Sequence, residues 1–412
     1  MKRRSIVLGV TLLLVCTLAA VFSGFGSRTS AIDKADIDSV VAGNNAFAFD
    51  LYRQLAKDKG NLFFSPYSIS SALAMTYAGA RGETARQMAD VLHFSLAPEK
   101  LHPAFLDLTG MFNADGKSYQ LSVANALWGQ VGYEFLPEFL DITKKYYGAG
   151  FKEVDYIDDG NREQARQTIN KWVEAKTNDK IKDLIQPNDL STLTRLVLTN
   201  AIYFKGKWEI QFKPEATKPM PFHISAKEKV DVPMMHQVAK FNYAENDQAQ
   251  ILEMPYTGGE LSMVVLLPKP EYELAKLEGM LRPEVIRSWL SQLSREKVEV
   301  FLPRFKLEKR FLLNEQLQGL GMIDAFDENA ADFSGMTRGR DLYISRVIHK
   351  AFVEVNEEGT EAAAATAVVM SGKSIVLDEP PVFCADRPFV FLIRDLRSGS
   401  ILFMGRLADP RG

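Results

Sequence analysis

The sequence predicts an α+β fold in which large β-sheets are partly covered by helices. Helical periodicity dominates the first half of the chain, and strand-like apolar runs dominate the second half. That order of elements is typical of an α+β architecture. Without a leader the chain keeps about 380 residues, more than most single cores hold, yet no Gly/Ser-rich or Pro-rich linker interrupts it. We therefore expect one large interwoven domain, residues 41–412.

The N-terminal residues 1–26 have the composition of an export signal. Three basic residues follow Met1, an apolar run covers residues 6–22, and small residues come next. This pattern predicts a secreted or extracytoplasmic protein. The apolar run is close to the minimum length that spans a bilayer, so an uncleaved membrane anchor is the alternative. We expect residues 27–40 to form a flexible N-terminal segment.

Periodicity places the remaining elements along the chain in order. Helical spacing of apolar residues predicts helices over residues 44–56, 69–92 and 163–177. Short apolar or alternating runs predict strands over residues 121–128, 195–204, 261–267, 298–302, 389–393 and 400–405.

Composition and motif searches exclude several classes of function. The net charge is −3 and no Lys/Arg cluster is present, so we expect no nucleic-acid partner. Outside the predicted signal Cys384 is the one cysteine, which rules out an internal disulfide. The five histidines show no metal-ligand spacing, and no nucleophile elbow occurs. The sequence therefore predicts a protein that is not an enzyme and that needs no cofactor.

A stretch near the C-terminus, residues 357–374, is built mostly from small uncharged side chains. It lacks the Asn, Asp and Pro that turn chemistry places in ordinary loops. Laid out as a strand, its side chains alternate between two faces. Glu361 then falls on one face, whereas Thr360, Ala362 and Ala364 share the other. Because that second face is small and uncharged, we infer that the stretch is able to enter a gap in an existing sheet.

Composition alone leaves a second interpretation of this stretch open. A run of four alanines is a strong helix former, so an ordinary surface helix fits as well as a strand. A phosphate-binding loop fits worse. Gly372-Lys373-Ser374 ends like that motif, but Ala367 stands where it needs a glycine, and the residues leading to Pro380 cannot open the required helix.

Six groups of residues, in order along the chain, resemble the motifs of the serpin family. The first opens with Asn-Leu-Phe-Phe-Ser-Pro at residues 61–66. One such motif is weak, but six in family order are specific, and they favour an exposed loop over the surface helix. The matching segments are residues 61–75 with 79–88, 200–208, 232–235, 302–305, 348–366, and 385–389 with 402–406.

The resemblance implies the serpin fold, with three β-sheets, eight to nine helices and an exposed reactive-centre loop at about residues 357–378. It also implies a suicide-substrate mechanism. A target protease attacks the loop and is trapped as the acyl-enzyme when the cut loop inserts into the main sheet. Insertion pairs backbone groups that were exposed, so the intact fold is held short of its most stable state by kinetics.

The resemblance also implies where the loop is cut. In the family the bond follows the fourteenth residue beyond the hinge glycine, which counted from Gly359 gives the Lys373-Ser374 bond. A lysine there matches trypsin-like serine proteases, whose binding pocket carries a carboxylate. Because the stretch after this bond is longer than in many serpins, Met370-Ser371 is a fallback for a chymotrypsin-like target.

Further positions carry over from the family one by one. The hinge has no bulky or charged residue on its inward face, which favours an inhibitor over the alternative, a non-inhibitory serpin that acts as a binding or chaperone protein. The implied hinge is Gly359, Thr360, Glu361, Ala362, Ala363, Ala364, Ala365 and Thr366. The implied top of the main sheet, where insertion begins, holds Trp208, Arg304 and Glu357, and the cluster under its middle holds Ser65, Ser68, Asn200 and His349.

The expected partner is a target serine protease held in a covalent acyl complex, and we expect the inhibitor itself to be a monomer. Some serpins are activated by polyanions. Residues 96–110, near the expected site, hold Lys100 as their one basic Lys/Arg residue, so we expect no polyanion site.

Overall fold

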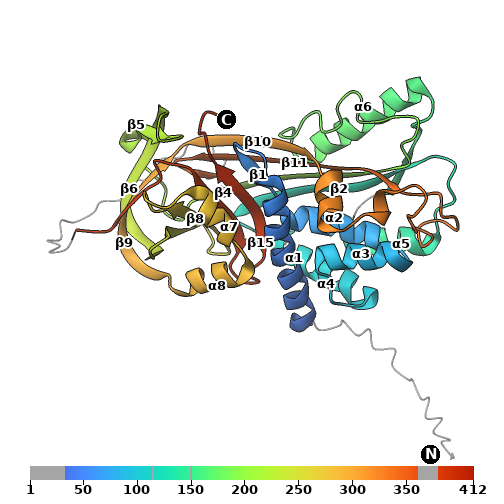
Figure 1. Ribbon diagram of the computed structural model, residues 1–412, viewed down its shortest axis with the longest axis horizontal. Helices are drawn as coiled ribbons and strands as arrows, with labels where there is room; N and C mark the ends of the chain where they lie inside the picture. Colours follow the sequence, from blue (N-terminus) through green and yellow to red (C-terminus); the bar gives the residue numbers. More distant parts are fainter. Residues whose placement is uncertain (1–32, 114–115, 149–150, 361–378) are drawn as a thin grey trace, which may run out of the picture.

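The computed structural model describes residues 33–113, 116–148, 151–360 and 379–412 (Figure 1). Within these residues the chain forms nine α-helices, six of them in its first half. They are α1 (Lys34–Leu55), α2 (Pro66–Tyr77), α3 (Gly82–Leu92), α4 (Pro98–Asn113), α5 (Pro137–Tyr147), α6 (Asp159–Lys176), α7 (Leu274–Met280), α8 (Pro283–Ser291) and α9 (Asn314–Leu320).

A six-stranded sheet lies across the top of the molecule in Figure 1. Its strands follow the order β10-β11-β12-β4-β2-β3, and β11 also pairs directly with β4. The strands are β2 (Tyr119–Gln130), β3 (Phe151–Val154), β4 (Leu196–Lys207), β10 (Phe305–Leu312), β11 (Ile344–Asn356) and β12 (Gly359–Thr360).

Nine further strands are joined by hydrogen bonds, eight of them in the order β1-β15-β14-β8-β7-β6-β9-β13, with β6 and β9 as the longest. Short strands pair with their outer halves, β5 with β6 and β13 with β9, and form a small third sheet there. The prediction of three sheets and eight to nine helices is thus confirmed. The nine strands are β1 (Leu62–Phe64), β5 (Lys218–His223), β6 (Lys229–Glu245), β7 (Ala249–Pro255), β8 (Leu261–Pro268), β9 (Ser294–Pro303), β13 (Val382–Cys384), β14 (Phe389–Asp395) and β15 (Ile401–Leu407).

Apolar clusters cover both faces of the six-stranded sheet. Helix α6 lies on the outer face (Figure 1), where its Ile169 belongs to one buried cluster with Trp128 of β2. On the inner face Phe204 of β4 joins a cluster with Phe63 and Phe403, whose rings stack with centroids 5.2 Å apart. The sheet is therefore a layer between α6 and the nine-stranded part, as a strand buried on both faces requires.

The predicted strands are confirmed, with ends that differ by up to four residues. All six predicted strand segments are strands, namely β2, β4, β8, β9, β14 and β15. The single helical stretch predicted at 69–92 is wrong, because α2 ends at Tyr77 and α3 begins at Gly82. The chain turns between them at Gly79, where a Cβ would lie 2.1 Å from the Met336 side chain. This close approach of Gly79 to Met336 separates the two helices, and the spacing of apolar residues along the chain does not reveal it.

The first helix begins earlier than predicted. Asp33 accepts a hydrogen bond from the N–H of Ala35 (3.1 Å) and caps α1, which then runs from Lys34. Residues 34–40, predicted as part of a flexible segment, are thus helical, because Ile37 and Val40 bury their side chains in the core. The predicted signal, residues 1–26, lies outside the described residues. In the part of the chain that the structure describes, none of the helices is long and apolar enough to cross a bilayer.

Candidate functional site

The six-stranded sheet opens at one end of its central strands. Strands β4 and β11 pair in parallel from Leu196 and Ile344 as far as Tyr203 and Phe352. Beyond this point β12 lies between them and pairs antiparallel with both. The first two residues of the predicted hinge are therefore already a central strand of the sheet.

Glycine is required at the first of these two positions. Gly359 has φ of 151°, and a Cβ there would lie 2.1 Å from the carbonyl oxygen of Gly206. A side chain would therefore force β12 away from β4. Its neighbour Thr360 is fully buried, pairs with Gly206 and Val355, and shares a hydrogen bond of 2.8 Å with the hydroxyl of Tyr256.

Trp208 joins the top of β4 to the turn before the hinge. Its backbone N–H donates to the carbonyl of Glu358 (2.8 Å), and its indole Nε1–H donates to the carbonyl of Asn356 (3.0 Å). The indole stacks on Tyr256 with ring centroids 4.6 Å apart and planes 15° apart. Sequence reasoning found Trp208 but missed Tyr256, because a tyrosine after a strand carries no pattern that marks it.

Glu357 and Arg304 form the predicted ion pair at the same end of the sheet. The guanidinium Nε of Arg304 donates to both carboxylate oxygens, at 2.7 and 2.8 Å, and the hydroxyl of Thr217 also contacts Glu357. The Glu357 side chain is 7% exposed and the Arg304 side chain 43% exposed, so the carboxylate is buried while the guanidinium remains open to water. Burial acts to raise the pKa of Glu357, but the hydrogen bonds from Arg304 and Thr217 outweigh it and lower the pKa.

The four residues predicted under the middle of the sheet lie together in a buried hydrogen-bonded cluster. His349 of β11 and Asn200 of β4 are register partners, and Nδ1 of His349 bonds Oδ1 of Asn200. The N–H of Ser65 donates to Nε2 of His349 (3.1 Å), and Nδ2 of Asn200 donates to Oγ of Ser68 (2.6 Å). These side chains join the two strands that must part if a strand is to enter between them.

One member of this cluster was missed from the sequence. Oδ1 of Asn125, on β2, accepts hydrogen bonds from Ser68 (3.1 Å) and from Asn200, and its Nδ2 donates to the carbonyl of Ser68. The alternation of β2 gives no sign that one asparagine among apolar neighbours is paired inside the sheet. Ser65 also begins α2, since its Oγ accepts from the N–H of Ser68 (3.1 Å).

We predict that acid destabilises the protein through His349. Burial lowers the pKa of His349 from 6.5 to about 3, so between these values the unfolded chain binds a proton that the folded chain does not. The stabilising contribution of the neutral ring is complete above pH 6.5 and is lost as pH falls, by about 1.5 kcal/mol between pH 6.5 and 5. Urea unfolding of His349→Gln should show a shallower pH dependence by that amount.

A second buried histidine supplies a parallel test of the same effect. Burial lowers the pKa of His102 to about 4, so His102 contributes in the same pH window. His102→Gln should remove a similar part of the pH dependence, and the two variants together should remove most of it. An unchanged pH dependence in His349→Gln would contradict the assignment.

The remaining predicted residues lie outside the described part of the chain. These are Glu361, Ala362, Ala363, Ala364, Ala365 and Thr366 of the hinge, and Lys373 with Ser374. The next described residue, Glu379, leads into β13, which pairs with β9. The strands on either side of residues 361–378, β12 and β13, therefore belong to different sheets.

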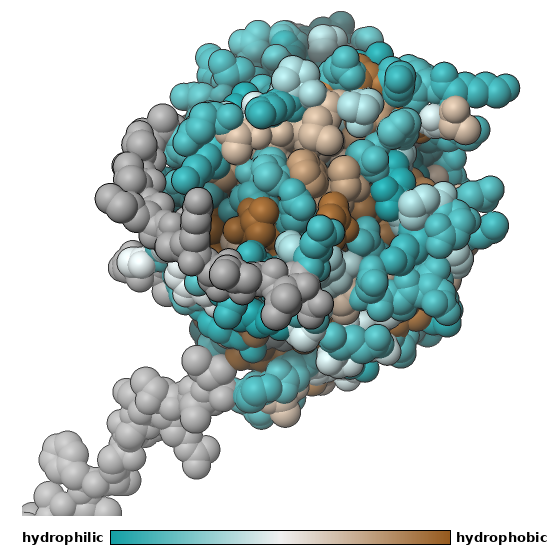
Figure 2. All heavy atoms as spheres, turned by 90° about the vertical axis from the view of Figure 1, so that its left-hand side faces the viewer, coloured by the Kyte–Doolittle hydropathy of each residue, from teal (hydrophilic) through white to brown (hydrophobic). Residues whose placement is uncertain are grey.

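The end of the molecule that carries β5, β6 and β9 is mainly hydrophilic. Figure 2 shows this end, with a small island of hydrophobic residues among polar ones. Val238 and Val382 are exposed there and flank Glu299 in register on three adjacent strands. This surface includes β13, the strand that follows residues 361–378.

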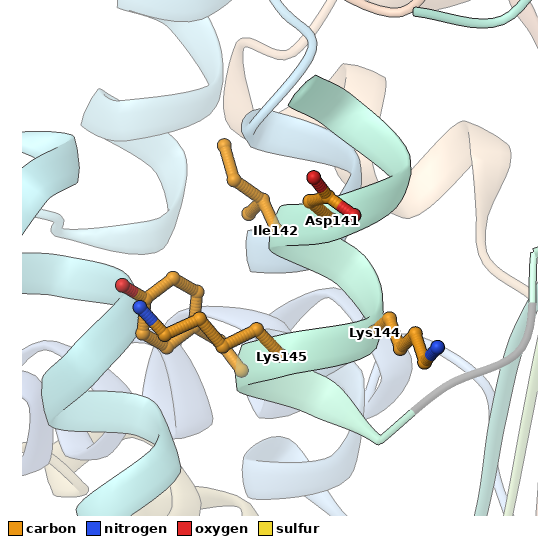
Figure 3. Close-up of a pocket in the computed structure, with 5 residues that line it drawn as sticks. Asp141, Ile142, Lys144 and Lys145 are labelled. Carbon is orange, nitrogen blue, oxygen red and sulfur yellow. The ribbon is translucent and has the colours of Figure 1, made fainter. Parts of the chain in front are cut away.

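A hollow of about 600 Å³ beside α5 does not form a ligand site. Figure 3 shows that the side chains lining it leave the helix in different directions, with Lys144 on one side and Lys145 on the other. A small-molecule site needs polar groups that converge on one point. These groups diverge, so we assign this hollow no cofactor.

Comparisons with known proteins agree with the geometry. A sequence model described as Serpin (serine protease inhibitor) matches residues 42–410. The chain is 45% identical to human leukocyte elastase inhibitor over 384 residues, which cover 91% of this chain and 100% of that protein. The structure is similar to uncleaved ovalbumin (TM-score 0.81, 32% identity, 90% and 100% covered) and to human thyroxine-binding globulin (TM-score 0.84, 31% identity, 91% and 99% covered).

The predicted location is wrong by these comparisons. Leukocyte elastase inhibitors from several mammals and human serpin B8 match this chain, and such proteins are typically intracellular and lack a signal peptide. A basic start followed by an apolar run is typical of a segment that enters an export pathway. That pattern is local, and it takes no account of the proteins that the rest of the chain resembles. The prediction of a secreted, extracytoplasmic or membrane-anchored protein is therefore withdrawn.

Two other predictions are confirmed. The matched relatives are named as inhibitors, which agrees with the prediction that the protein is not an enzyme. The family match covers 42–410, and the fold of uncleaved ovalbumin is shared along nearly the whole chain. The chain therefore belongs to the serpin family of serine protease inhibitors.

Proposed function

We propose that residues 41–412 form one inhibitor domain whose loop, about residues 357–378, is cut by a target protease and then inserts between β4 and β11. One observation carries this proposal: β12, the two residues that begin the loop, already pairs with both strands at their open end. A strand continuing from Thr360 would take the place of the direct β4–β11 pairing and would pair on both sides.

The rest of the site supports the same mechanism. The hydrogen bond between His349 and Asn200 joins β4 to β11 midway along the seam, and we propose that it exchanges partners as the seam opens. Trp208 and the Glu357–Arg304 pair hold the turn from which the strand enters. Trapping the acyl-enzyme then depends on insertion being faster than hydrolysis of the acyl bond.

We further propose that the target has trypsin-like specificity and cuts Lys373-Ser374. The count of fourteen residues begins at Gly359, which is the first residue of β12. Leukocyte elastase inhibitor is named for a different kind of protease, and that name favours the Met370-Ser371 alternative. We give more weight to Lys373 than to the name of a relative, because specificity resides in the loop and not in the shared fold.

We predict that Lys373→Met exchanges the target class. Loss of the cation that pairs with the pocket carboxylate should lower the rate of trypsin inhibition by about 30- to 1000-fold. Inhibition of chymotrypsin should rise, because methionine suits an apolar pocket. Second-order rate constants with both proteases measure the change.

The control for this exchange is Lys373→Arg, which keeps the cation and should keep trypsin inhibition. Met370→Lys tests the alternative bond. If Lys373→Met inhibits trypsin as well as the unmodified protein does, the bond assignment is wrong.

A binding protein is the second candidate, and one cavity favours it. A cavity of about 440 Å³ lies between α1 and α8, with Val41, Phe49, Ile286 and Leu392 among its apolar lining and Arg394 among its polar lining. Human thyroxine-binding globulin, which shares the fold, is named for a small molecule that it binds. In this second case a protease would cut the loop without being trapped.

A further inference from the structure

We propose that Tyr256 is a positioning residue whose hydroxyl holds Thr360 in the sheet, so that loop insertion starts from a preformed nucleus. This inference rests on the proposed function, because it concerns the step in which the cut loop enters between β4 and β11. It goes further by assigning the start of that step to one hydrogen bond.

The Tyr256 ring is held in one orientation by its neighbours. The side chain is 1% exposed, its ring stacks on Trp208, and Phe204 of β4 meets its ring edge-to-face with centroids 5.0 Å apart. A Cβ on Gly206 would lie 3.0 Å from Cδ1 of Tyr256, so the ring occupies the space beside β4 that a side chain would need. The hydroxyl is consequently aimed at one place.

That place is the side chain of Thr360. The two hydroxyl oxygens lie 2.8 Å apart, both side chains are buried, and in the described part of the chain Thr360 is the one hydrogen-bond partner of the Tyr256 hydroxyl. Burial raises the pKa of Tyr256 well above its ordinary value, so the hydroxyl keeps its proton. One hydroxyl therefore donates and the other accepts, and loss of either leaves a buried polar group unpaired.

The hydrogen bond connects the hinge to a residue that is tied both to β4 and to the second layer. Tyr256 follows β7 of the nine-stranded part, and its backbone pairs with Leu261 at the start of β8. On its other side it forms an antiparallel bridge with Trp208, and the N–H of Thr257 donates to the carbonyl of Lys207 at the end of β4. When β4 and β11 separate, Thr360 is thus held on the β4 side of the seam.

Holding the first pair matters because the first pair of a new strand is the hardest to form. Fixing the backbone of the hinge costs conformational entropy before any further hydrogen bonds form, whereas each later residue adds to a strand that already exists. With β12 in place before cleavage, insertion continues from Thr360 into the seam. Without the hydroxyl, β12 leaves the sheet more often, and insertion must wait for it to return.

The test compares Tyr256→Phe with the unmodified protein, using trypsin as the probe. Phenylalanine keeps the ring contacts and removes the hydrogen bond, so association with trypsin should change by less than about twofold. Insertion, followed by stopped-flow tryptophan fluorescence, should slow about fivefold. The number of inhibitor molecules consumed per trapped protease should rise accordingly, since more acyl-enzyme is hydrolysed before it is trapped.

Two further variants separate positioning from loss of stability. Thr360→Val removes the same bond from the other side, so the double variant should behave like either single variant. Tyr67→Phe removes a similar buried contact, to the hydroxyl of Thr109 (2.7 Å), away from the hinge. It should lower stability by a similar amount and leave the consumption of inhibitor unchanged.

The outcomes distinguish this inference from the proposed function. If the unmodified protein traps none of the proteases tested, the proposed function fails and the positioning role fails with it. If it traps trypsin and Tyr256→Phe inserts and consumes inhibitor at the same rate, the function stands and the positioning role is overturned. Equal effects of Tyr256→Phe and Tyr67→Phe would also overturn it.

Discussion

Thr360→Arg should turn the protein from an inhibitor into a plain substrate of trypsin. Thr360 is fully buried between Gly206 and Val355, so an arginine there would bring a charge into the sheet without a partner. Burying an unpaired charge costs several kcal/mol, and each 1.4 kcal/mol slows a step about tenfold. Insertion should therefore slow by at least about a hundredfold, while cleavage of the loop continues.

The measurement is the amount of denaturation-resistant complex formed at equimolar trypsin, beside the amount of cut inhibitor. Thr360→Ser is the matched control, because serine keeps the hydroxyl and the small volume and should trap trypsin almost normally. If Thr360→Arg trapped trypsin as efficiently as Thr360→Ser, insertion between β4 and β11 could not be the mechanism.

Asn200→Ala should weaken the seam between β4 and β11 and shorten the active life of the inhibitor. It leaves Nδ1 of His349 without its acceptor and removes the donor to Ser68 and Asn125. Losses of this kind in a buried cluster typically cost about 2–4 kcal/mol. We expect a lower apparent Tm and a faster loss of trypsin inhibition during incubation at moderate heat, because the seam then opens without a protease.

A second buried asparagine supplies the matched control. Asn170 of α6 exchanges hydrogen bonds with the backbone of Ile185, at 2.9 and 2.8 Å, on the outer side of the sheet. Asn170→Ala should also lower the apparent Tm. Its loss of trypsin inhibition on incubation should become faster only in proportion to its faster unfolding. Equal inactivation rates in the two variants at equal stability would show that the Asn200 cluster has no special role in the seam.

The sequence predicted the strands better than it predicted the limits of the helices. Strands such as β8 and β14 are short apolar runs with clear ends, so composition alone finds them. The break between α2 and α3 depends on how Gly79 meets Met336, a residue more than 250 positions away. Local periodicity contains no information about such a contact.

The candidate site was predicted in part for a similar reason. Gly359 and Thr360 were predicted, from the resemblance to the family, as the hinge of an exposed loop, whereas they are buried and already form β12 within the sheet. Tyr256 and Asn125 were missed, because their importance comes from partners on other strands. The burial of Glu357 was also not predictable, since it follows from how Thr217 and Arg304 close over the carboxylate.

The most direct test of the central claim mixes the protein with trypsin at equimolar ratio. The products are separated on a denaturing gel, and the released C-terminal peptide is analysed by mass spectrometry. We predict a complex that survives denaturation together with a peptide that begins at Ser374. A peptide beginning at Ser371 would move the bond and keep the mechanism. Clean cleavage without any complex, by trypsin and equally by chymotrypsin-like and elastase-like proteases, would contradict inhibition by loop insertion.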